Sequence, residues 1–310
     1  MKTILITGGS GLVGNRLTEK LKAKGYKVIW LSRYRNIKAE IPRYRWDYHK
    51  EEIDTEALQQ SNIVVHLAGS NLGDGSWTKT KKQQIVESRI LTTKLLLQTY
   101  KSLNIQPEAF ISASAVGYYG MHTDDNIYTE DSEPARNDFL SRTCQKWESA
   151  AFQFHEEQNV RVVALRTSFV VSKDSEAFKK MVLPTRFGLG APMGNGKQYM
   201  SWIHIDDLCN LYIKSIEDSS MSGVYNAVAP HFTTNKEFMR TVAKELKRPY
   251  IIPGIPSFIL KLVMGEAAGM VLEGVRVSSQ KVIDSGYEFQ YPTAKEAIQV
   301  SANNEGFNQQ

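Results

Sequence analysis

The sequence predicts an α/β fold, namely a Rossmann-type doubly wound parallel sheet followed by a smaller, mostly helical C-terminal lobe. Two observations predict the sheet. Short apolar runs alternate with amphipathic helical patterns through the first half of the chain, and a glycine-rich loop joins the first strand to the first helix. A third observation predicts the second lobe, because the alternation stops after Arg166 and short helical segments punctuated by prolines follow.

The expected elements follow from hydrophobic periodicity. Strands are expected at residues 3–7, 28–31, 44–47, 63–67, 109–112 and 160–165. Helices are expected at residues 12–24, 55–60, 79–102 and 138–157, so that strand and helix alternate. A glycine-rich loop at 188–196 precedes two further strands, at 202–205 and 224–227, and a helix that begins near Asp206 and is capped by an Asp. Residues 234–237 form a capping box that opens a later helix.

Composition excludes several classes of protein. The formal net charge of +5 is spread along the chain, and the basic cluster at residues 79–82 is interpreted as a solvated helix face, so no nucleic-acid binding is expected. Cys144 and Cys209 are too few for a disulfide framework, and no Cys/His spacing indicates a metal site. The chain shows no signal peptide and no apolar stretch of about 18 residues, so we expect a cytoplasmic protein with no membrane contact.

The strongest motif lies between the first strand and the first helix. It consists of Thr7, Gly8, Gly9, Ser10, Gly11, Leu12, Val13 and Gly14. In a dinucleotide-binding loop, Gly8 allows a sharp turn, Gly11 lets the backbone approach a pyrophosphate, and Gly14 lets the helix close onto the sheet. The N-terminus of the helix supplies unsatisfied N–H groups and partial positive charge for the phosphates. A purely structural turn is the alternative.

The residues after the second strand predict which dinucleotide is bound. A carboxylate at this position binds the ribose 2′-hydroxyl of NAD(H), but here the chain reads Ser32, Arg33, Tyr34 and Arg35. Arg33 can form paired hydrogen bonds with a 2′-phosphate, so NADP(H) is preferred over NAD(H). We therefore expect residues 1–172 to form an NADP(H)-binding domain to which residues 202–228 return. Residues 173–201 and 229–310 are expected to form the smaller substrate lobe.

Further motifs narrow the assignment. They are Trp77, the trio Ser88, Arg89 and Thr92, and the segments 112–120, 129–131, 147–148, 165–166, 194–197 and 201–207. Together they resemble the YfcH-like epimerase family proteins, an atypical extended branch of the short-chain dehydrogenase/reductase superfamily whose C-terminal portion is a domain of unknown function. The resemblance runs from Lys2 to about Ala297. It implies NAD(P)-dependent epimerase, dehydratase or reductase chemistry on a nucleotide sugar or a related small molecule.

The resemblance also assigns parts of the cofactor site. Asp47, after the third strand, matches the position that accepts a hydrogen bond from the adenine amino group. Leu67, Ala68 and Gly69 match the turn after the fourth strand, where small residues let the cofactor lie close. The two long helices, residues 79–102 and 138–157, match those through which relatives dimerise, so a homodimer is expected.

The catalytic set is incomplete. In the superfamily a Ser or Thr and a Tyr hold the reacting carbonyl, and a Lys four residues after the Tyr assists it. Ser114 matches the serine, but Phe139 and Thr143 stand where the Tyr and Lys are expected. Tyr119 is the preferred substitute acid, with Tyr118 beside it at the mouth of the cleft.

The sequence leaves two interpretations open for Arg89 and for Lys146. Arg89 either contacts an anionic substrate or forms an ion pair, Lys146 either reaches the cofactor ribose or is solvated, and His204 is interpreted as structural. Two functions remain open: a nucleotide-sugar epimerase or carbonyl reductase with a degenerate Tyr-Lys pair, and a catalytically silent NADP(H)-binding or redox-sensing protein. The expected substrate is small, anionic and nucleotide-linked.

Overall fold

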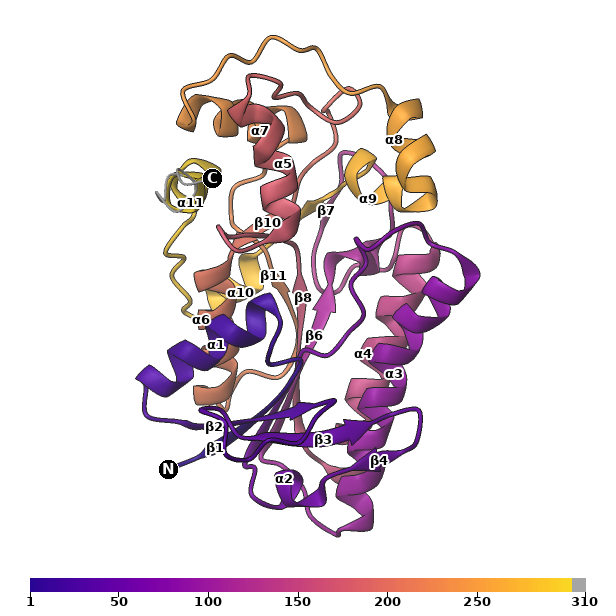
Figure 1. Cartoon of the computed structure of the whole chain (residues 1–310), viewed down its shortest axis with the longest axis vertical. Helices are drawn as coiled ribbons and strands as arrows, with labels where there is room; N and C mark the ends of the chain where they lie inside the picture. The colour runs from indigo at the N-terminus through magenta and orange to yellow at the C-terminus, as the bar shows by residue number, and fades with distance from the viewer. Residues whose placement is uncertain (303–310) are drawn as a thin grey trace.

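An eight-stranded sheet runs through the lower half of the molecule (Figure 1), which is known from a computed structural model that describes residues 1–302. Its strand order is β11-β8-β6-β5-β1-β2-β3-β4, and all neighbours are parallel except β3 and β4. The strands are β1 (Thr3–Thr7), β2 (Lys27–Ser32), β3 (Arg43–Asp47), β4 (Glu52–Ile53), β5 (Ile63–His66), β6 (Ala109–Ala115), β8 (Arg161–Thr167) and β11 (Gly223–Ala227).

Helices cover both faces of this sheet, as the alternation of apolar side chains along a buried strand requires. In β1, Ile4 and Ile6 belong to the core beneath α1 (Leu12–Ala23) and α6 (Ile205–Glu217). Leu5 points to the opposite core, beneath the other helices. These are α2 (Thr55–Gln59), α3 (Lys79–Ser102) and α4 (Phe139–Gln158).

The position of β1 determines where a ligand can lie. The chain runs from β1 outward to β2 and β3, and then crosses to β5 on the other side of β1. In an open α/β sheet, such a reversal of strand order leaves a crevice outside the carboxyl ends of the two central strands. The glycine-rich loop after β1 and the turn after β5 therefore face each other across this crevice.

The C-terminal lobe lies above the carboxyl ends of the sheet (Figure 1). One core joins the short parallel pair β9 and β10 to α5, α7 and α11, with Trp202, Phe178 and Phe238 buried in it. The remaining elements are β7 (Ile127–Tyr128), η1 (Val116–Tyr119), β9 (Phe169–Val171), α5 (Glu176–Arg186), β10 (Trp202–His204), α7 (Asn235–Glu245), α8 (Ser257–Met264), η2 (Gly265–Ala268), α9 (Gly269–Leu272), β12 (Arg276–Val277), α10 (Gln280–Asp284) and α11 (Ala294–Ala302). Within residues 1–302, no helix is long and apolar enough to cross a membrane.

The fold class is confirmed, and the expected strands and long helices differ from the observed ones by only a few residues. The capping box of α7 is also present, between Thr234 and Glu237. The prediction that strand and helix alternate throughout is wrong, because β2 is followed by β3 with no helix between them. Of residues 202–228, α6 packs on the core of the large sheet and β11 pairs with β8 within that sheet, whereas β10 pairs with β9 in a separate sheet. Two-residue strands such as β4, β7 and β12 are too short to carry a periodic signal.

One buried carboxylate joins α6 to the segment before α11. Asp207 Oδ1 accepts from the Tyr287 hydroxyl and the Gln290 amide, both at 2.7 Å, and Oδ2 accepts from the Tyr291 amide at 2.9 Å. We predict that Asp207→Ala lowers the free energy of unfolding by about 3 kcal/mol, because three donors lose their acceptor. Chemical denaturation measures the effect, and the exposed Asp174→Ala is the control that should stay near wild type. A loss below about 0.5 kcal/mol for Asp207→Ala would contradict this role.

Candidate functional site

Two positions in the loop after β1 must be glycine, because neighbouring backbone atoms leave no room for a Cβ there. Gly8 has φ +68°, and a Cβ there would lie 2.9 Å from the carbonyl carbon and oxygen of Leu67. A Cβ on Gly14 would lie 2.5 Å from the Gly8 oxygen, so α1 could not close onto the loop. Gly9 is buried against the indole of Trp30. The loop is therefore fixed between β1, β5 and α1 before any ligand binds.

Gly11 differs from the others because its free side is open. A Cβ there would meet only the Gly8 oxygen, at 3.3 Å, and Ser10 and Gly11 are exposed. Gly11 is the N-cap of α1 with no side-chain cap, and the first turn contains no acidic residue. The half-buried Leu12 and Val13 follow, with no intrahelical acceptor for the first amides of the helix. This end of α1 fits the pyrophosphate of a dinucleotide.

Thr7 holds the two turns together rather than facing the crevice. Its side chain is 0 % exposed, and its hydroxyl oxygen accepts from the Leu67 and Ala68 amides, each at 3.1 Å. The hydroxyl proton therefore goes to His66 Nδ1, 2.8 Å away, and leaves the proton of His66 on Nε2, which faces Thr92 Oγ1 at 3.2 Å. Thr7, Gly9 and Gly14 are thus packing residues, and Gly8, Ser10, Gly11, Leu12 and Val13 are the accessible part of the loop.

Two arginines after β2 have different surroundings. Arg35 pairs with Asp54 at 2.7 Å and Glu56 at 2.8 Å. Arg33 is exposed and has no ion pair or hydrogen bond among residues 1–302. Of the two guanidinium groups, only that of Arg33 is free to receive a 2′-phosphate. Asp47 lies at the end of β3, half-buried, and accepts from the His49 amide at 3.0 Å.

A buried polar network lies at the carboxyl ends of β6 and β8. Ser114 donates its hydroxyl proton to Glu148 Oε1 at 2.5 Å, and Arg166 binds both oxygens of Glu148 at 2.9 Å. All three side chains are buried. Burial opposes the charge on Arg166, but the hydrogen bonds that Arg166 donates to Glu148 hold the pKa of Arg166 above its usual range. Because Ser114 donates to Glu148, its oxygen is left to accept a hydrogen bond from a substrate.

This ion pair was not predicted from the sequence. Glu148 lies on α4 and its partner Arg166 lies on β8, 18 residues away along the chain. The available signal was an arginine directly after the apolar run 160–165, since a charge at the end of a buried strand needs a partner.

The expected position of Tyr119 at the cleft mouth is wrong. Its side chain is 0 % exposed, and its hydroxyl lies 2.7 Å from Asn226 Oδ1 and accepts from Arg166 Nη1 at 3.0 Å. Burial raises the pKa of Tyr119 to about 12. A phenol enclosed in this way is unsuited to donating a proton to a substrate. Tyr118 is half-buried, and no residue in the described part of the chain binds its hydroxyl. The Arg166 guanidinium lies 3.4 Å from the centre of its ring.

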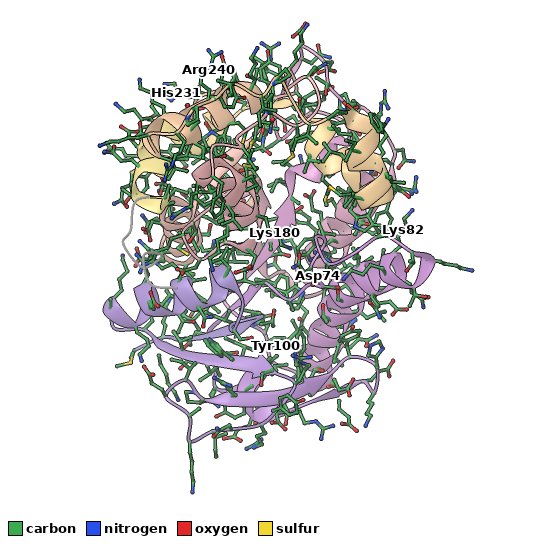
Figure 2. All side chains as sticks on the ribbon, turned by 45° about the horizontal axis from the view of Figure 1, so that its top comes forward. Asp74, Lys82, Tyr100, Lys180, His231 and Arg240 are labelled. Carbon is green, nitrogen blue, oxygen red and sulfur yellow. The ribbon has the colours of Figure 1, made fainter. Side chains whose placement is uncertain are left out.

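Positions 139 and 143 are both used for packing. The ring of Phe139 contacts Trp77 edge to face, with centroids 5.2 Å apart. Thr143 is buried and donates to the Phe139 carbonyl at 2.7 Å. Lys146 is exposed on the outer side of α4, which agrees with the solvated interpretation. Figure 2 labels Lys82 at the start of α3. Its ammonium group lies 5.1 Å from the centre of the Phe139 ring and pairs with Glu266.

Arg89 forms no ion pair with any described carboxylate. Its guanidinium donates to the Ile85 carbonyl at 2.9 Å and the Ser70 carbonyl at 3.2 Å. It also explains Gly69, because a Cβ there would lie 3.0 Å from Arg89 Cζ. Gly69 thus makes room for Arg89. Burial lowers the pKa of Arg89 from its usual value.

His204 is structural, but it is itself the cap of α6, which was expected to be an Asp. Its Nδ1 accepts from the Asp206 amide at 3.2 Å, and burial lowers the pKa of His204 to about 4. Asp206 instead pairs with Arg16 at 2.8 Å, which joins α6 to α1. Among residues 1–302, no three His, Cys, Asp or Glu side chains are placed to hold a metal.

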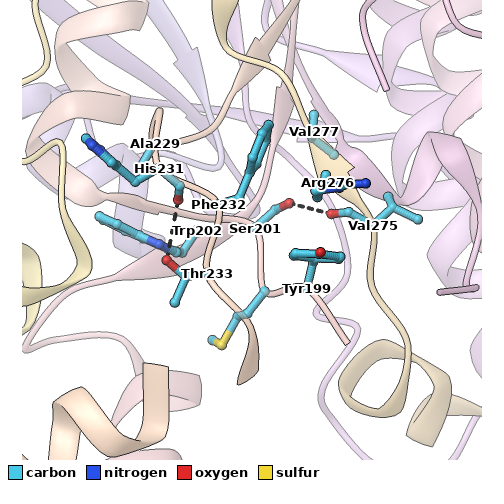
Figure 3. A pocket seen from close by; sticks show the side chains of 11 residues that line it. Tyr199, Ser201, Trp202, Ala229, His231, Phe232, Thr233, Val275, Arg276 and Val277 are labelled. Atoms are coloured by element: carbon cyan, nitrogen blue, oxygen red, sulfur yellow. Dashed lines mark hydrogen bonds between the residues drawn. The ribbon is translucent and has the colours of Figure 1, made fainter. Parts of the chain in front are cut away.

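A small hollow lies in the C-terminal lobe (Figure 3). Tyr199, Trp202, Phe232 and Arg276 are among the residues that line it. The Trp202 Nε1 and Arg276 Nε atoms are buried without a hydrogen-bond partner in the described chain. The Arg276 guanidinium lies 5.0 Å from the centre of the Tyr199 ring. The hollow is only about 10 Å³, room for about one water molecule, so the unpaired donors face a space too small for a larger ligand.

Family models cover most of the chain. The model described as "NAD dependent epimerase/dehydratase family" matches residues 4–227. A second, "Domain of unknown function (DUF1731)", matches residues 255–300.

Curated relatives match along their full length. Epimerase family protein SDR39U1 of Mus musculus is 34% identical over 298 residues, which cover 95% of this chain and 98% of that protein. Epimerase family protein YfhF of Bacillus subtilis strain 168 is 32% identical over 300 residues, covering 95% and 96%.

Solved structures agree in fold. Human epimerase family protein SDR39U1 (isoform 2), crystallised with NADPH, has a TM-score of 0.86 at 32% identity, covering 97% of this chain and 99% of that one. UDP-glucose 4-epimerase of Thermotoga maritima, solved with UDP-glucose, has a TM-score of 0.76 at 18% identity, covering 96% and 97%, and shows the fold alone.

His66 makes a pH-dependent contribution to stability. Burial lowers the pKa of His66 from 6.5 to about 3, so below pH 6.5 the unfolded chain binds a proton that the folded protein excludes. Stability from this group is complete above about pH 6.5 and is lost progressively toward pH 3. We predict that wild type loses about 2 kcal/mol more than His66→Gln between pH 7.5 and pH 5 in urea denaturation. The exposed His49→Gln should keep the wild-type dependence, and an equally steep loss in His66→Gln would contradict the assignment.

Proposed function

Because the chain belongs to the NAD dependent epimerase/dehydratase family, we propose that it binds NADP(H) and catalyses reduction of a carbonyl group or epimerisation of a nucleotide-linked sugar. The observation that carries the cofactor assignment is the contrast between the free guanidinium of Arg33 and the paired guanidinium of Arg35. The human relative of 32% identity, crystallised with NADPH, supports it. The open side of Gly11 and the uncapped start of α1 provide the phosphate site.

NADP(H), when bound, donates or accepts a hydride, and the protein supplies position and proton transfer. In the alcohol form of the reacting group, Ser114 accepts a hydrogen bond from the substrate hydroxyl, since its own proton is bound by Glu148. We assign the proton donor to Tyr118 in place of Tyr119, because no residue of the described chain binds the Tyr118 hydroxyl. The Arg166 guanidinium over its ring stabilises negative charge that develops as the proton leaves.

A specific observation favours the second candidate, an NADP(H)-binding protein without turnover that senses the redox state of the nucleotide pool. Phe139 and Thr143 fill their positions with packed side chains, which neither hold a substrate oxygen nor assist a phenol. The cofactor site does not depend on these two residues. Binding without turnover is therefore compatible with the geometry.

For the substrate we propose a small anionic molecule with a planar group, such as a nucleotide-linked sugar. This proposal follows the resemblance of the sequence, because the hollow lined by Tyr199 and Phe232 is about 10 Å³ and too small for the planar group. The expected homodimer through α3 and α4 also stays a prediction, which sedimentation of the purified protein tests.

Cofactor selectivity gives the first test. We predict that NADPH binds at least about tenfold more tightly than NADH. Arg33→Ala should reduce this difference in affinity by weakening the binding of NADPH alone, because one phosphate contact is worth about 1.5–3 kcal/mol. Isothermal titration calorimetry measures both affinities. Arg35→Ala is the matched control, since Arg35 is already bound by Asp54 and Glu56, and it should keep the preference. Equal affinities of wild type for NADPH and NADH would exclude the assignment.

Turnover gives the second test. If the site is a weakened form of the ordinary one, Phe139→Tyr combined with Thr143→Lys increases NADPH oxidation over a panel of carbonyl substrates, by about tenfold or more. Tyr118→Phe in the wild-type background should lower any basal rate by a similar factor. If NADPH oxidation stays at background in wild type and in the double variant, the enzyme proposal fails and the silent binder remains.

A further inference from the structure

Arg89 carries a positive charge that no described side chain neutralises. Its hydrogen-bond acceptors are two backbone carbonyls, and no carboxylate pairs with it within residues 1–302. The guanidinium is half-buried against the indole of Trp147, 5.0 Å from the ring centre. A partly desolvated cation without a counter-charge is costly unless an anion or a polar ligand joins it.

The strand order places Arg89 beside one particular half of the crevice. Arg33 follows β2 and Asp47 ends β3, and both strands lie on one side of β1, so the two residues define the adenosine end. A dinucleotide that passes the N-terminus of α1 continues over the carboxyl ends of β5 and β6, where Ser114 lies. Arg89 donates to Ser70, four residues beyond the end of β5. It therefore adjoins the nicotinamide half of the crevice.

On its other side, Arg89 faces α4. Trp147, which its guanidinium covers, lies one helical turn beyond Thr143, so both side chains are on the same face of the helix. The charge of Arg89 also acts on Cys144, the neighbour of Thr143. Arg89, on α3, therefore lies beside the face of α4 that carries Thr143, where the lysine is expected in the superfamily.

We propose that Arg89 supplies, from α3, the positive charge and hydrogen-bond donors for the nicotinamide half of the cofactor that α4 lacks at Thr143. The inference rests on the proposed NADP(H) binding. Two carbonyls fix two of the guanidinium nitrogens and leave further donors for ribose hydroxyls. A cation here also disfavours the positively charged ring of oxidised nicotinamide relative to the neutral reduced ring, so the site selects NADPH over NADP⁺.

The experiment compares three ligands on the full-length protein by calorimetry. NADPH and NADP⁺ contain the nicotinamide half, whereas adenosine 2′,5′-bisphosphate contains only the adenosine half. We expect Arg89→Gln to lower the affinity for NADPH about tenfold and to change the affinity for the bisphosphate less than about twofold. The affinities for NADPH and NADP⁺ should also become more similar. Arg33→Ala should instead weaken the bisphosphate. Lys146→Gln, which removes an exposed cation of α4, is the matched control and should change none of the three.

A second substitution tests whether Arg89 acts through its charge or through packing. Thr143→Lys added to Arg89→Gln should restore the selectivity for NADPH over NADP⁺, and Arg89→Lys should retain most of it. Equal weakening of all three ligands in Arg89→Gln, or an unchanged ratio of NADPH to NADP⁺ affinity, would show a structural role and overturn the proposal. Wild-type protein that binds neither NADPH nor the bisphosphate would contradict the proposed function itself, a result distinct from failure at Arg89.

Discussion

The close contact between the turn after β1 and the turn after β5 is the constraint on which the rest of the site depends. Thr7 joins the two turns by accepting from two amides of one and donating to His66 beneath it. Gly8 allows the approach, since a Cβ would meet the Leu67 backbone at 2.9 Å. This contact aligns the start of α1 with the turn that contains Gly69. A crevice lined by backbone amides is then fixed at the reversal of strand order.

Charges are distributed along that crevice in a consistent way. Within residues 1–302, Arg33 at one end has no partner while its neighbour Arg35 is paired, and Arg89 at the other end is held by carbonyls without a counter-charge. Between them the N-terminus of α1 contributes its partial positive charge. Arg166 is also cationic but is neutralised by Glu148, so it organises Ser114 and Tyr118 without adding net charge. The arrangement suits an elongated ligand with anionic groups toward the adenosine end.

The large sheet could be predicted from the sequence, because its strands and helices carry strong periodic signals. The glycine loop was also recognisable, since its spacing and its position between strand and helix are local. Contacts between distant segments were not: the burial of Tyr119 depends on Asn226, and the ion pair of Glu148 depends on β8. Likewise, Gly69 was expected to make room for the cofactor, whereas the side chain that requires a glycine there belongs to α3.

The most direct measurement is a crystal structure of the protein soaked with NADPH. We expect electron density with the pyrophosphate on the amides at the start of α1, the 2′-phosphate against Arg33, and the nicotinamide beside Ser114. An empty crevice at saturating NADPH, or a dinucleotide bound elsewhere on the protein, would contradict this expectation.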